Sequence, residues 1–245
     1  MKDKAFFSMM MAVLLLLQSC GSVTDESVSA DSECKYYNVC IILDGTDRLS
    51  QCNSVPRIGV DEIVKFARTI SEKGKGALYV GYVDKNCDNN SVAMFEWSQD
   101  RPSGIGKKPD YMPVKEYEKQ KRFSDSIADA YRSSIETAVM NSRTEITSIH
   151  ELAYSDFVAQ QSRGSDVNGA INQAIRLLRA SDGGFEKSYI VLVSDGADNV
   201  GKPLNTLPES IDLLIVNANN SKHQYGSMVS KELVTLTQAF NYIFK

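Results

Sequence analysis

The sequence predicts an α/β protein of three layers, with a doubly wound, mostly parallel sheet between helices and a helical insertion. Strand-like apolar runs alternate along the chain with segments of helical periodicity, which is the pattern of parallel strands joined by crossover helices. Two of these runs, 37–43 and 188–193, are apolar almost throughout, as central strands buried on both faces are. An Asp-Gly pair follows each of them, at positions 44–45 and 195–196.

The first part of the predicted domain contains three strands and one helix. They are expected in the order strand 37–43, helix 61–71, strand 77–83 and strand 92–97. Gly74 and Gly76 are expected to end the helix, because glycine is common just past a helix C-terminus. Segment 99–113 contains both glycine and proline and is therefore expected to be a loop.

The second part begins with an unusually long helical segment. Residues 115–161 are rich in charge and contain neither proline nor glycine, and their apolar residues recur at spacings of three and four. This predicts one long helix or two consecutive ones, inserted into the domain at about 114–161. The remaining elements are expected as helix 167–178, strand 188–193, strand 211–216, helix 231–240 and an edge strand at 242–244.

The N-terminus carries the pattern of a bacterial secretion signal. Two lysines precede the apolar run 5–17, which is shorter than the roughly 20 residues that span a bilayer. The sequence Leu17-Gln18-Ser19-Cys20 resembles a lipobox. This resemblance implies cleavage before Cys20, whose thiol then carries diacylglycerol, with further acylation by fatty acids such as palmitate. An ordinary signal peptide with an incidental cysteine is the alternative.

The domain boundaries follow from this signal. Residues 1–19 form the predicted lipoprotein signal peptide, 20–34 a small, polar and acidic tether, and 35–245 one domain. The expected location is the bacterial cell envelope, with the lipid at Cys20 as the membrane anchor. The residue after this cysteine is Gly21 and not an aspartate. By resemblance to sorted lipoproteins, this favours the outer membrane.

Charge and histidine content exclude two classes of function. The chain has 27 basic and 31 acidic residues, a net charge of −4, which argues against nucleic acid as a partner. Its two histidines, His150 and His223, are too few for a metal site made of several histidines.

Four cysteines besides Cys20 leave the disulfide pairing open. An exported protein can form disulfides, and four cysteines allow three full pairings. Cys52 and Cys87 are the first choice, because each follows a predicted strand in loops at the same end of the sheet. Cys34 with Cys40 is a weaker choice, and Cys40 inside a strand also fits a buried thiol.

Two aspartates at strand ends predict a binding site. If the strands before Asp44 and Asp195 are central and parallel, both carboxylates lie at one edge of the sheet, where α/β proteins bind ligands. A cation between them would relieve their repulsion. Hydroxyls of Thr46 and Ser165 would add to the oxygen ligands that Mg²⁺ prefers. The plainer alternative is that both aspartates only cap turns.

These residues resemble the metal-ion-dependent adhesion site of the von Willebrand factor A-type family. The family has an Asp-x-Ser-x-Ser turn after the first strand, a threonine in a later loop before a helix, and an aspartate after the fourth major strand. Asp44 and Thr46 match the turn, and Ser165 and Asp195 match the later positions. The resemblance spans roughly 35–245. It implies a bound Mg²⁺ that an acidic residue of a protein partner completes, and no enzyme activity.

Arg48 departs from the family pattern, which has a serine at the third position of the turn. The change removes one metal ligand and adds a positive charge. Arg48 therefore offers an alternative, in which its guanidinium neutralises Asp44 or Asp195 and replaces the metal. The domain would then be a metal-independent scaffold that acts through its helical insertion.

Two enzyme classes share part of their sequence patterns with this chain. Asp44-Gly45-Thr46 is similar to part of the Asp-x-Asp-Gly-Thr signature of haloacid-dehalogenase-type phosphatases, but Ile42 occupies the place of the nucleophilic aspartate. A serine hydrolase triad with His150 or His223 lacks a Gly-x-Ser-x-Gly nucleophile elbow. Both observations favour binding of an unidentified protein partner.

Overall fold

A computed structural model describes residues 35–45, 55–155, 164–181, 187–217 and 224–245. The chain divides into two units after Glu33, and all described residues belong to the second unit.

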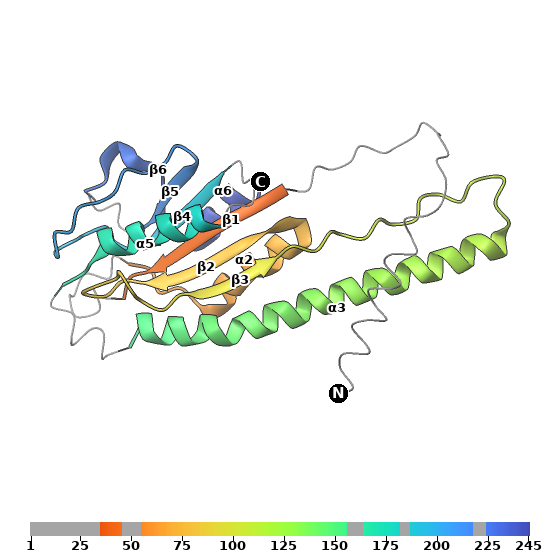
Figure 1. The fold of residues 1–245 in the computed structure, drawn as a ribbon, viewed down its shortest axis with the longest axis horizontal. Helices are drawn as coiled ribbons and strands as arrows, with labels where there is room; N and C mark the ends of the chain where they lie inside the picture. Colours follow the sequence, from red (N-terminus) through yellow and green to blue (C-terminus); the bar gives the residue numbers. More distant parts are fainter. Residues whose placement is uncertain (1–34, 46–54, 156–163, 182–186, 218–223) are drawn as a thin grey trace. The chain divides into compact units, whose positions relative to one another are not determined.

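The domain is built on a six-stranded sheet in the order β3-β2-β1-β4-β5-β6. All neighbouring strands are parallel except β2 and β3. This confirms the predicted α/β class with a mostly parallel sheet (Figure 1). The strands are β1 (Lys35–Leu43), β2 (Gly74–Tyr82), β3 (Ala93–Trp97), β4 (Ser188–Val193), β5 (Ile211–Val216) and β6 (Val229–Leu233).

Helices cover both faces of this sheet and complete the three layers. One face carries α2 (Val60–Lys73), α3 (Val114–Ala153) and α6 (Leu236–Ile243), and the other carries α5 (Val167–Ala180). A 3-10 turn, η3 (Gly226–Met228), precedes β6. The side chains of β1 divide between the two apolar cores as strand geometry requires: Val39 and Ile41 face α2, whereas Cys40 and Ile42 face α5.

Of the insertion predicted at about 114–161, residues Val114–Ala153 form one continuous helix, α3, whereas residues 156–161 lie outside the described residues. Every buried residue of α3 lies in its second half, from Ile135 onward, where the helix packs against α2, β2 and β3. The first half extends beyond the sheet (Figure 1). Among the described residues, no helix combines the length and the apolar character needed to cross a membrane.

The C-terminal prediction was wrong in detail. Instead of a helix over 231–240, residues Val229–Leu233 form the edge strand β6, and the helix begins at Leu236. Residues 242–244 belong to the end of α6 and not to a strand. The backbone of β6 pairs with β5, and this long-range pairing outweighs the local helical pattern. Gly76, expected to follow the helix, lies inside β2.

Candidate functional site

The candidate site lies at the carboxyl edge of the sheet, between β1 and β4. From this central pair the chain continues to β2 on one side and to β5 on the other, so the strand order reverses here. Open α/β sheets bind their ligands in the crevice at such a point. Asp44 directly follows β1, and Asp195 follows β4 after one residue. The topology therefore brings both predicted ligands to the carboxyl edge of β1 and β4, which we call the crevice.

Asp44 is fastened to the end of β4. Its backbone N–H donates to the carbonyl oxygen of Val193 over 3.0 Å, and the Ser194 hydroxyl donates to its Oδ2 over 2.6 Å. The same hydroxyl accepts the backbone N–H of Gly196 at 2.9 Å. Because Asp44 is only 2% exposed, these bonds orient a buried carboxylate toward the Asp-Gly turn after β4. Ser194 was missed by the sequence analysis.

The turn after β4 holds Asp195 at the surface of the crevice. Asp195 is half-buried, and its Oδ1 accepts the N–H of Ala197 at 2.9 Å. Gly196 has φ of 76°, in the left-handed region that only glycine adopts without cost. The Asp-Gly pair thus reflects a tight turn that leaves Asp195 partly accessible.

Ser165 lies beside this turn because two loops bind each other. Its N–H donates to Asn199 Oδ1 over 2.6 Å, and the N–H of Asn199 donates back to its carbonyl oxygen over 3.2 Å. Asp198 Oδ1 also accepts the N–H of Asn168 in the first turn of α5, at 3.1 Å. The predicted ligands Asp44, Ser165 and Asp195 therefore lie on segments that are connected by hydrogen bonds.

Asp166 is the main functional neighbour that the sequence analysis missed. It is fully buried and caps α5, with Oδ1 accepting the N–H of Gly169 at 2.9 Å. Its Oδ2 accepts the N–H of Cys87 at 2.9 Å and the ammonium of Lys202 at 2.7 Å. The N–H of Asp166 donates to Asp84 O over 2.9 Å. An aspartate just before a helical pattern is a known N-cap signal that marked this position.

Lys202 extends this network to the loop after β2. Its ammonium contacts Asp166, Asp88 Oδ2 and Asn86 Oδ1, the last two at 2.8 Å. Hydrogen bonds to Asp166 and then to Asp88 raise the pKa of Lys202 above its ordinary value. Its contribution to stability is therefore complete at neutral pH and is lost only as the pH rises through this raised pKa.

Tyr225 contributes a buried hydroxyl beside the first turn of α5. It is buried, and its hydroxyl donates to Asn168 Oδ1 over 3.2 Å. Burial raises the pKa of Tyr225 most, and the negative charges of Asp198, Asp44 and Asp195 raise it further. These three carboxylates thus act together on one buried hydroxyl, which therefore stays protonated and able to donate a hydrogen bond.

The C-terminal end of α3 supports the opposite side of the crevice. A Cβ atom on Gly45 would overlap the carbonyl oxygen of Ala153, so glycine is needed for this close approach. His150 Nε2 contacts Ile58 O at 2.8 Å, and the N–H of Ile58 donates to the Tyr154 hydroxyl over 3.3 Å. The end of α3 and Tyr154 just after it therefore lie against Gly45 and Ile58.

The remaining predicted ligand and its neighbour, Thr46 and Arg48, lie in segment 46–54, outside the described residues. Cys20, in range 1–34, and Cys52 are likewise outside the described residues. In the described part of the chain, no group of three or more His, Cys, Asp or Glu side chains is placed to hold a metal. Two carboxylates and a hydroxyl are still a set of hard oxygen donors, and they suit Mg²⁺ if water and other oxygens complete its shell.

Cys87 is a free, buried thiol in the structure, whereas the sequence predicts a bridge to Cys52. Its Sγ accepts the N–H of Asp84 at 3.2 Å and lies 3.8 Å from Tyr82 O. Because Cys52 lies outside the described residues, this pairing stays a prediction. Cys40, interpreted as a buried strand thiol, is likewise free and buried.

We expect Cys40 and Cys87 to resist alkylation by iodoacetamide at pH 8 in the native protein. Burial raises the pKa of each thiol to about 12, and only the thiolate reacts. Because the unfolded thiol has a pKa of about 8.5, native stability should fall as the pH rises above this value. Peptide mapping after labelling measures both positions.

Unfolding in denaturant without reductant is the matched measurement for Cys87. A free thiol becomes labelled at once under these conditions. Labelling of Cys87 that appears only after reduction would contradict the free thiol and support the bridge to Cys52.

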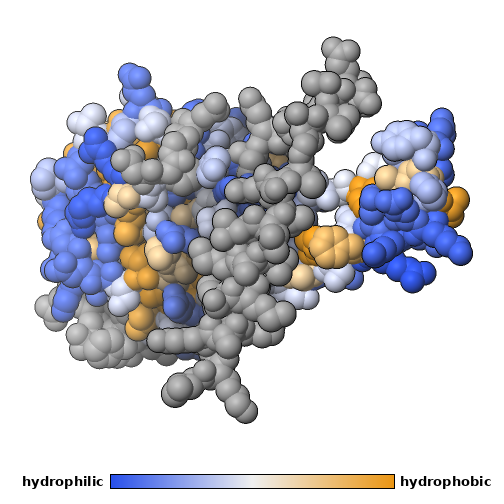
Figure 2. Space-filling model, turned by 45° about the vertical axis from the view of Figure 1, so that its right-hand side comes forward, coloured by the Kyte–Doolittle hydropathy of each residue, from blue (hydrophilic) through white to orange (hydrophobic). Residues whose placement is uncertain are grey.

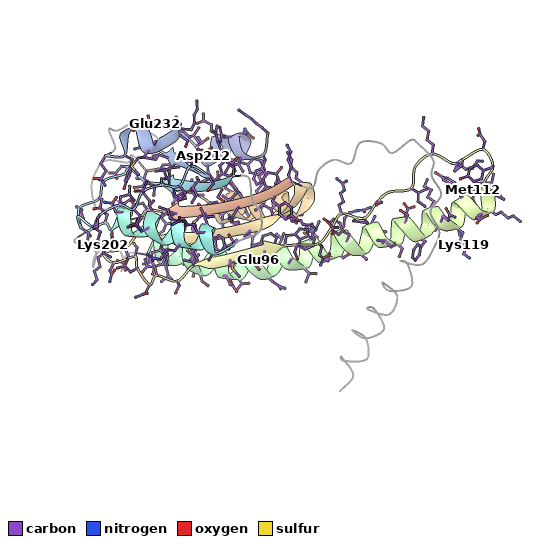
Figure 3. The ribbon with its side chains drawn as sticks, turned by 45° about the horizontal axis from the view of Figure 1, so that its top comes forward. Glu96, Met112, Lys119, Lys202, Asp212 and Glu232 are labelled. Carbon is purple, nitrogen blue, oxygen red and sulfur yellow. The ribbon has the colours of Figure 1, made fainter. Side chains whose placement is uncertain are left out.

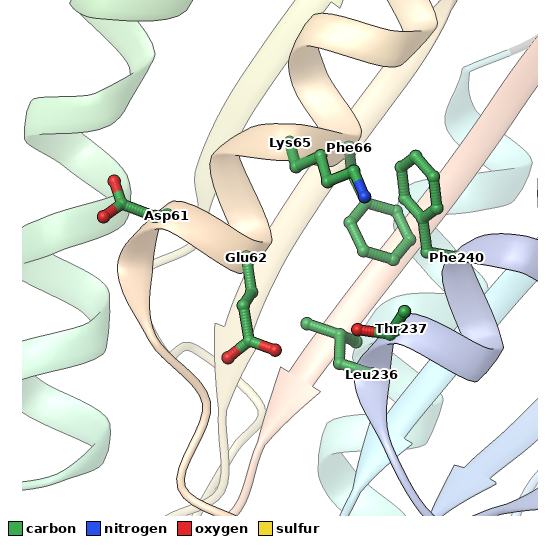
Figure 4. A pocket seen from close by; sticks show the side chains of 7 residues that line it. All are labelled: Asp61, Glu62, Lys65, Phe66, Leu236, Thr237 and Phe240. Atoms are coloured by element: carbon green, nitrogen blue, oxygen red, sulfur yellow. The ribbon is translucent and has the colours of Figure 1, made fainter.

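A second hollow lies between α2 and α6 (Figure 4). The Lys65 ammonium stands 4.2 Å above the ring of Phe240 there. The volume of this hollow, about 230 Å³, is below the 300–1,000 Å³ typical of small-molecule sites. None of its lining residues belongs to the crevice between β1 and β4. They are Asp61, Glu62, Lys65, Phe66, Leu236, Thr237 and Phe240.

Comparison of the chain with protein-family models, with curated protein sequences and with solved structures found no match.

Proposed function

We propose that the chain is a membrane-anchored bacterial lipoprotein whose domain resembles the von Willebrand factor A type and binds a protein partner. The observation that carries this proposal is the placement of Asp44, Ser165 and Asp195 on connected segments at the crevice between β1 and β4. The adhesion-site resemblance requires these three positions, which are far apart in the sequence, to meet at this edge of the sheet.

Asp44, Thr46, Ser165 and Asp195 are the residues that would hold Mg²⁺. When bound, the ion supplies a coordination position for a carboxylate of the partner. Within the chain, Ser194 orients Asp44, and the ties of Ser165 to Asn199 keep the loop before α5 beside the Asp195 turn. Carboxylate and hydroxyl oxygens are the ligands that Mg²⁺ prefers, and this chemistry supports a cation at this edge of the sheet.

A metal-independent scaffold is the second candidate, and the arginine at position 48 is the observation that favours it. Its guanidinium would neutralise the carboxylates of the crevice in place of the ion. In that case the specificity for a partner would come from the exposed first half of α3, which has no buried residue before Ile135.

Neither enzyme class gains support. Ile42, at the place of the phosphatase nucleophile, is an apolar side chain facing the α5 core and 2% exposed. The ring of His150 contacts the backbone carbonyl of Ile58, and His223 lies outside the described residues. Adhesion therefore remains the function that we propose.

Replacing Asp44 with asparagine is expected to abolish Mg²⁺ binding. Isothermal titration of the full acylated protein in detergent should detect heat for the unmodified chain. Loss of a supporting group alone weakens metal sites 10–100-fold, so loss of a direct ligand should lower the affinity by more than about 100-fold. Asparagine keeps an oxygen that can accept the Ser194 hydroxyl, so the fold should persist.

Asp61→Asn is the matched control, because this side chain is 82% exposed and pairs with Arg143 on the surface. It should bind Mg²⁺ like the unmodified chain. Arg48→Ser restores the serine of the family pattern and should strengthen binding. Absence of heat for both the unmodified chain and Arg48→Ser would overturn the metal site and leave the metal-independent scaffold.

A further inference from the structure

The protein carries a projecting arm, which we define as residues 98–134. It consists of the extended segment after β3 and the first half of α3. No residue of the arm is buried. Met112 and Lys119 mark its far end, well away from the sheet (Figure 3). Only the base of the arm contacts the domain, where Tyr131 packs against Trp97 and its hydroxyl donates to Ser71 O over 3.0 Å. The exposed remainder of the arm needs another explanation than the stability of that domain.

The arm leaves the sheet at its amino edge, opposite the candidate site. Tyr37 near the start of β1 pairs with Gly76, and Gly76 pairs with Trp97 at the end of β3. The three residues form one row across the sheet. The chain therefore enters β1 and leaves β3 at the same edge, which the ribbon also displays (Figure 1). Lys35, the first described residue, therefore lies at the edge of the sheet from which the arm leaves.

The end of the arm combines exposed apolar side chains with basic ones. Tyr111 is 85% exposed and Val114 is 59% exposed. Segment 107–122 contains six basic and three acidic residues, in a chain whose net charge is −4. In Figure 2 this end is a separate lobe, in which orange apolar patches stand among blue polar surface. Aromatic and apolar groups flanked by lysines are typical of surfaces that bind the membrane interface.

Internal hydrogen bonds hold this tip in shape. The Lys108 ammonium donates to Pro109 O over 3.0 Å and to Met112 O over 3.1 Å. Tyr117 fastens the returning helix through its hydroxyl, which donates to Gly106 O over 3.2 Å. Met112 N donates to Pro109 O over 3.1 Å. The turn therefore presents Tyr111 outward without an ordering cost on binding.

We infer that the tip of the arm, residues 107–122, binds the anionic lipid surface of the membrane that anchors the protein. This inference rests on the proposed lipid anchor at Cys20. Tether 20–34 reaches at most about 50 Å when extended, and the first half of α3 projects over about 30 Å. Both leave from the amino edge, so the tip can reach the bilayer while the crevice faces away from it, toward a partner.

The test places a tryptophan at the tip of the full-length protein. Tyr111→Trp is reconstituted in vesicles of phosphatidylethanolamine and phosphatidylglycerol, with or without bromine on the acyl chains. We expect a blue-shifted emission that the brominated lipids quench. Val234→Trp, at an exposed position just after β6 on the carboxyl edge, is the control that should show neither effect. The emission of the native Trp97 is subtracted from both measurements.

Charge is tested by replacing Lys107, Lys115 and Lys119 with glutamine in the Tyr111→Trp protein. Removing one lysine near an anionic surface should lower the equilibrium constant for contact between the tip and the membrane roughly fivefold. The corresponding triple arginine variant keeps the charges and should be quenched like the parent. Phosphatidylcholine vesicles should give little quenching.

The inference would be overturned if, in anionic vesicles, the emission of the Tyr111→Trp protein stayed at the wavelength of Trp in water and was not quenched. Equal quenching in neutral vesicles would overturn it as well. A blue shift that depends on protein density without quenching would also overturn it, in favour of a second copy of this chain. Mass spectrometry of Cys20 tests the anchor separately. A protein without acyl chains at Cys20 would contradict the proposed function. Binding of its tip could still be measured separately, by quenching after vesicles are added.

Discussion

Replacing Asp166 with alanine is expected to lower the free energy of unfolding by about 3 kcal/mol, one of the largest single effects in the chain. The carboxylate is fully buried and accepts from Gly169, Cys87 and Lys202. Its loss removes the cap of α5, worth about 1 kcal/mol. It also leaves the buried N–H of Cys87 without this acceptor, at a cost of about 1–3 kcal/mol.

Urea unfolding of the purified protein measures this effect. Asp166→Asn keeps one oxygen acceptor. Its free energy of unfolding should therefore lie between those of Asp166→Ala and the unmodified chain. Asp61→Ala, which removes an exposed ion pair, should stay within about 0.5 kcal/mol. Equal stability of Asp166→Ala and Asp61→Ala would mean that Asp166 does not join these loops.

The same substitution should weaken Mg²⁺ binding although no proposed ligand changes. Asp166 follows Ser165 directly and fixes the start of α5, so its loss allows Ser165 to move away from the Asp195 turn. Affinity unchanged from the unmodified chain would separate the capping network from the site.

The second large effect is expected for Gly45→Ala, with a loss of roughly 3 kcal/mol in the free energy of unfolding. A Cβ at this position overlaps the backbone oxygen of Ala153, so either the end of β1 or the end of α3 must shift. Ala153→Gly should not rescue the variant, because the overlapping atom belongs to the backbone. Since Asp44 is the adjacent residue, the shift should also impair the crevice.

Gly81→Ala is the matched control, because it is a buried strand glycine with space. The nearest atom to a Cβ there would be Val92 Cγ2 at 3.9 Å, an ordinary contact. Its stability in urea should equal or slightly exceed that of the unmodified chain. A Gly45→Ala protein that unfolds like Gly81→Ala would contradict the contact between β1 and α3.

Local pattern was sufficient where a strand is mostly apolar. Segments 188–193 and 211–216 were predicted with the bounds that β4 and β5 have. A run of this kind is buried on both faces and has few alternatives. The edge strand β6 was mistaken for a helix because exposed residues dominate it and its pairing with β5 lies outside any local window. Thr235, whose side chain accepts the Gln238 N–H, was the local sign of the true helix start.

The residues of the candidate site also fall into two groups, those that local sequence could identify and those that it could not. Asp44 and Asp195 could be proposed from their positions after two apolar strands, because parallel topology brings such ends together. Ser194 could not, because its bond to Asp44 joins residues 150 positions apart. Asp166 had a local N-cap signal, but its bonds to Cys87 and Lys202 join loops that are distant in the sequence. Tyr225, which donates to Asn168 at the start of α5, likewise lies where no sequence motif marks it.

The sequence by itself determined the α/β class, the long insertion and the pair of Asp-Gly turns, since hydrophobic periodicity and turn residues are properties of neighbouring positions. Only the tertiary structure decided that β1 and β4 are adjacent at the point where the strand order reverses, and that a buried aspartate and lysine unite three loops there. It also placed the arm at the amino edge and the crevice at the carboxyl edge. Those relations depend on strand order and direction, which hydrogen bonds between distant segments establish.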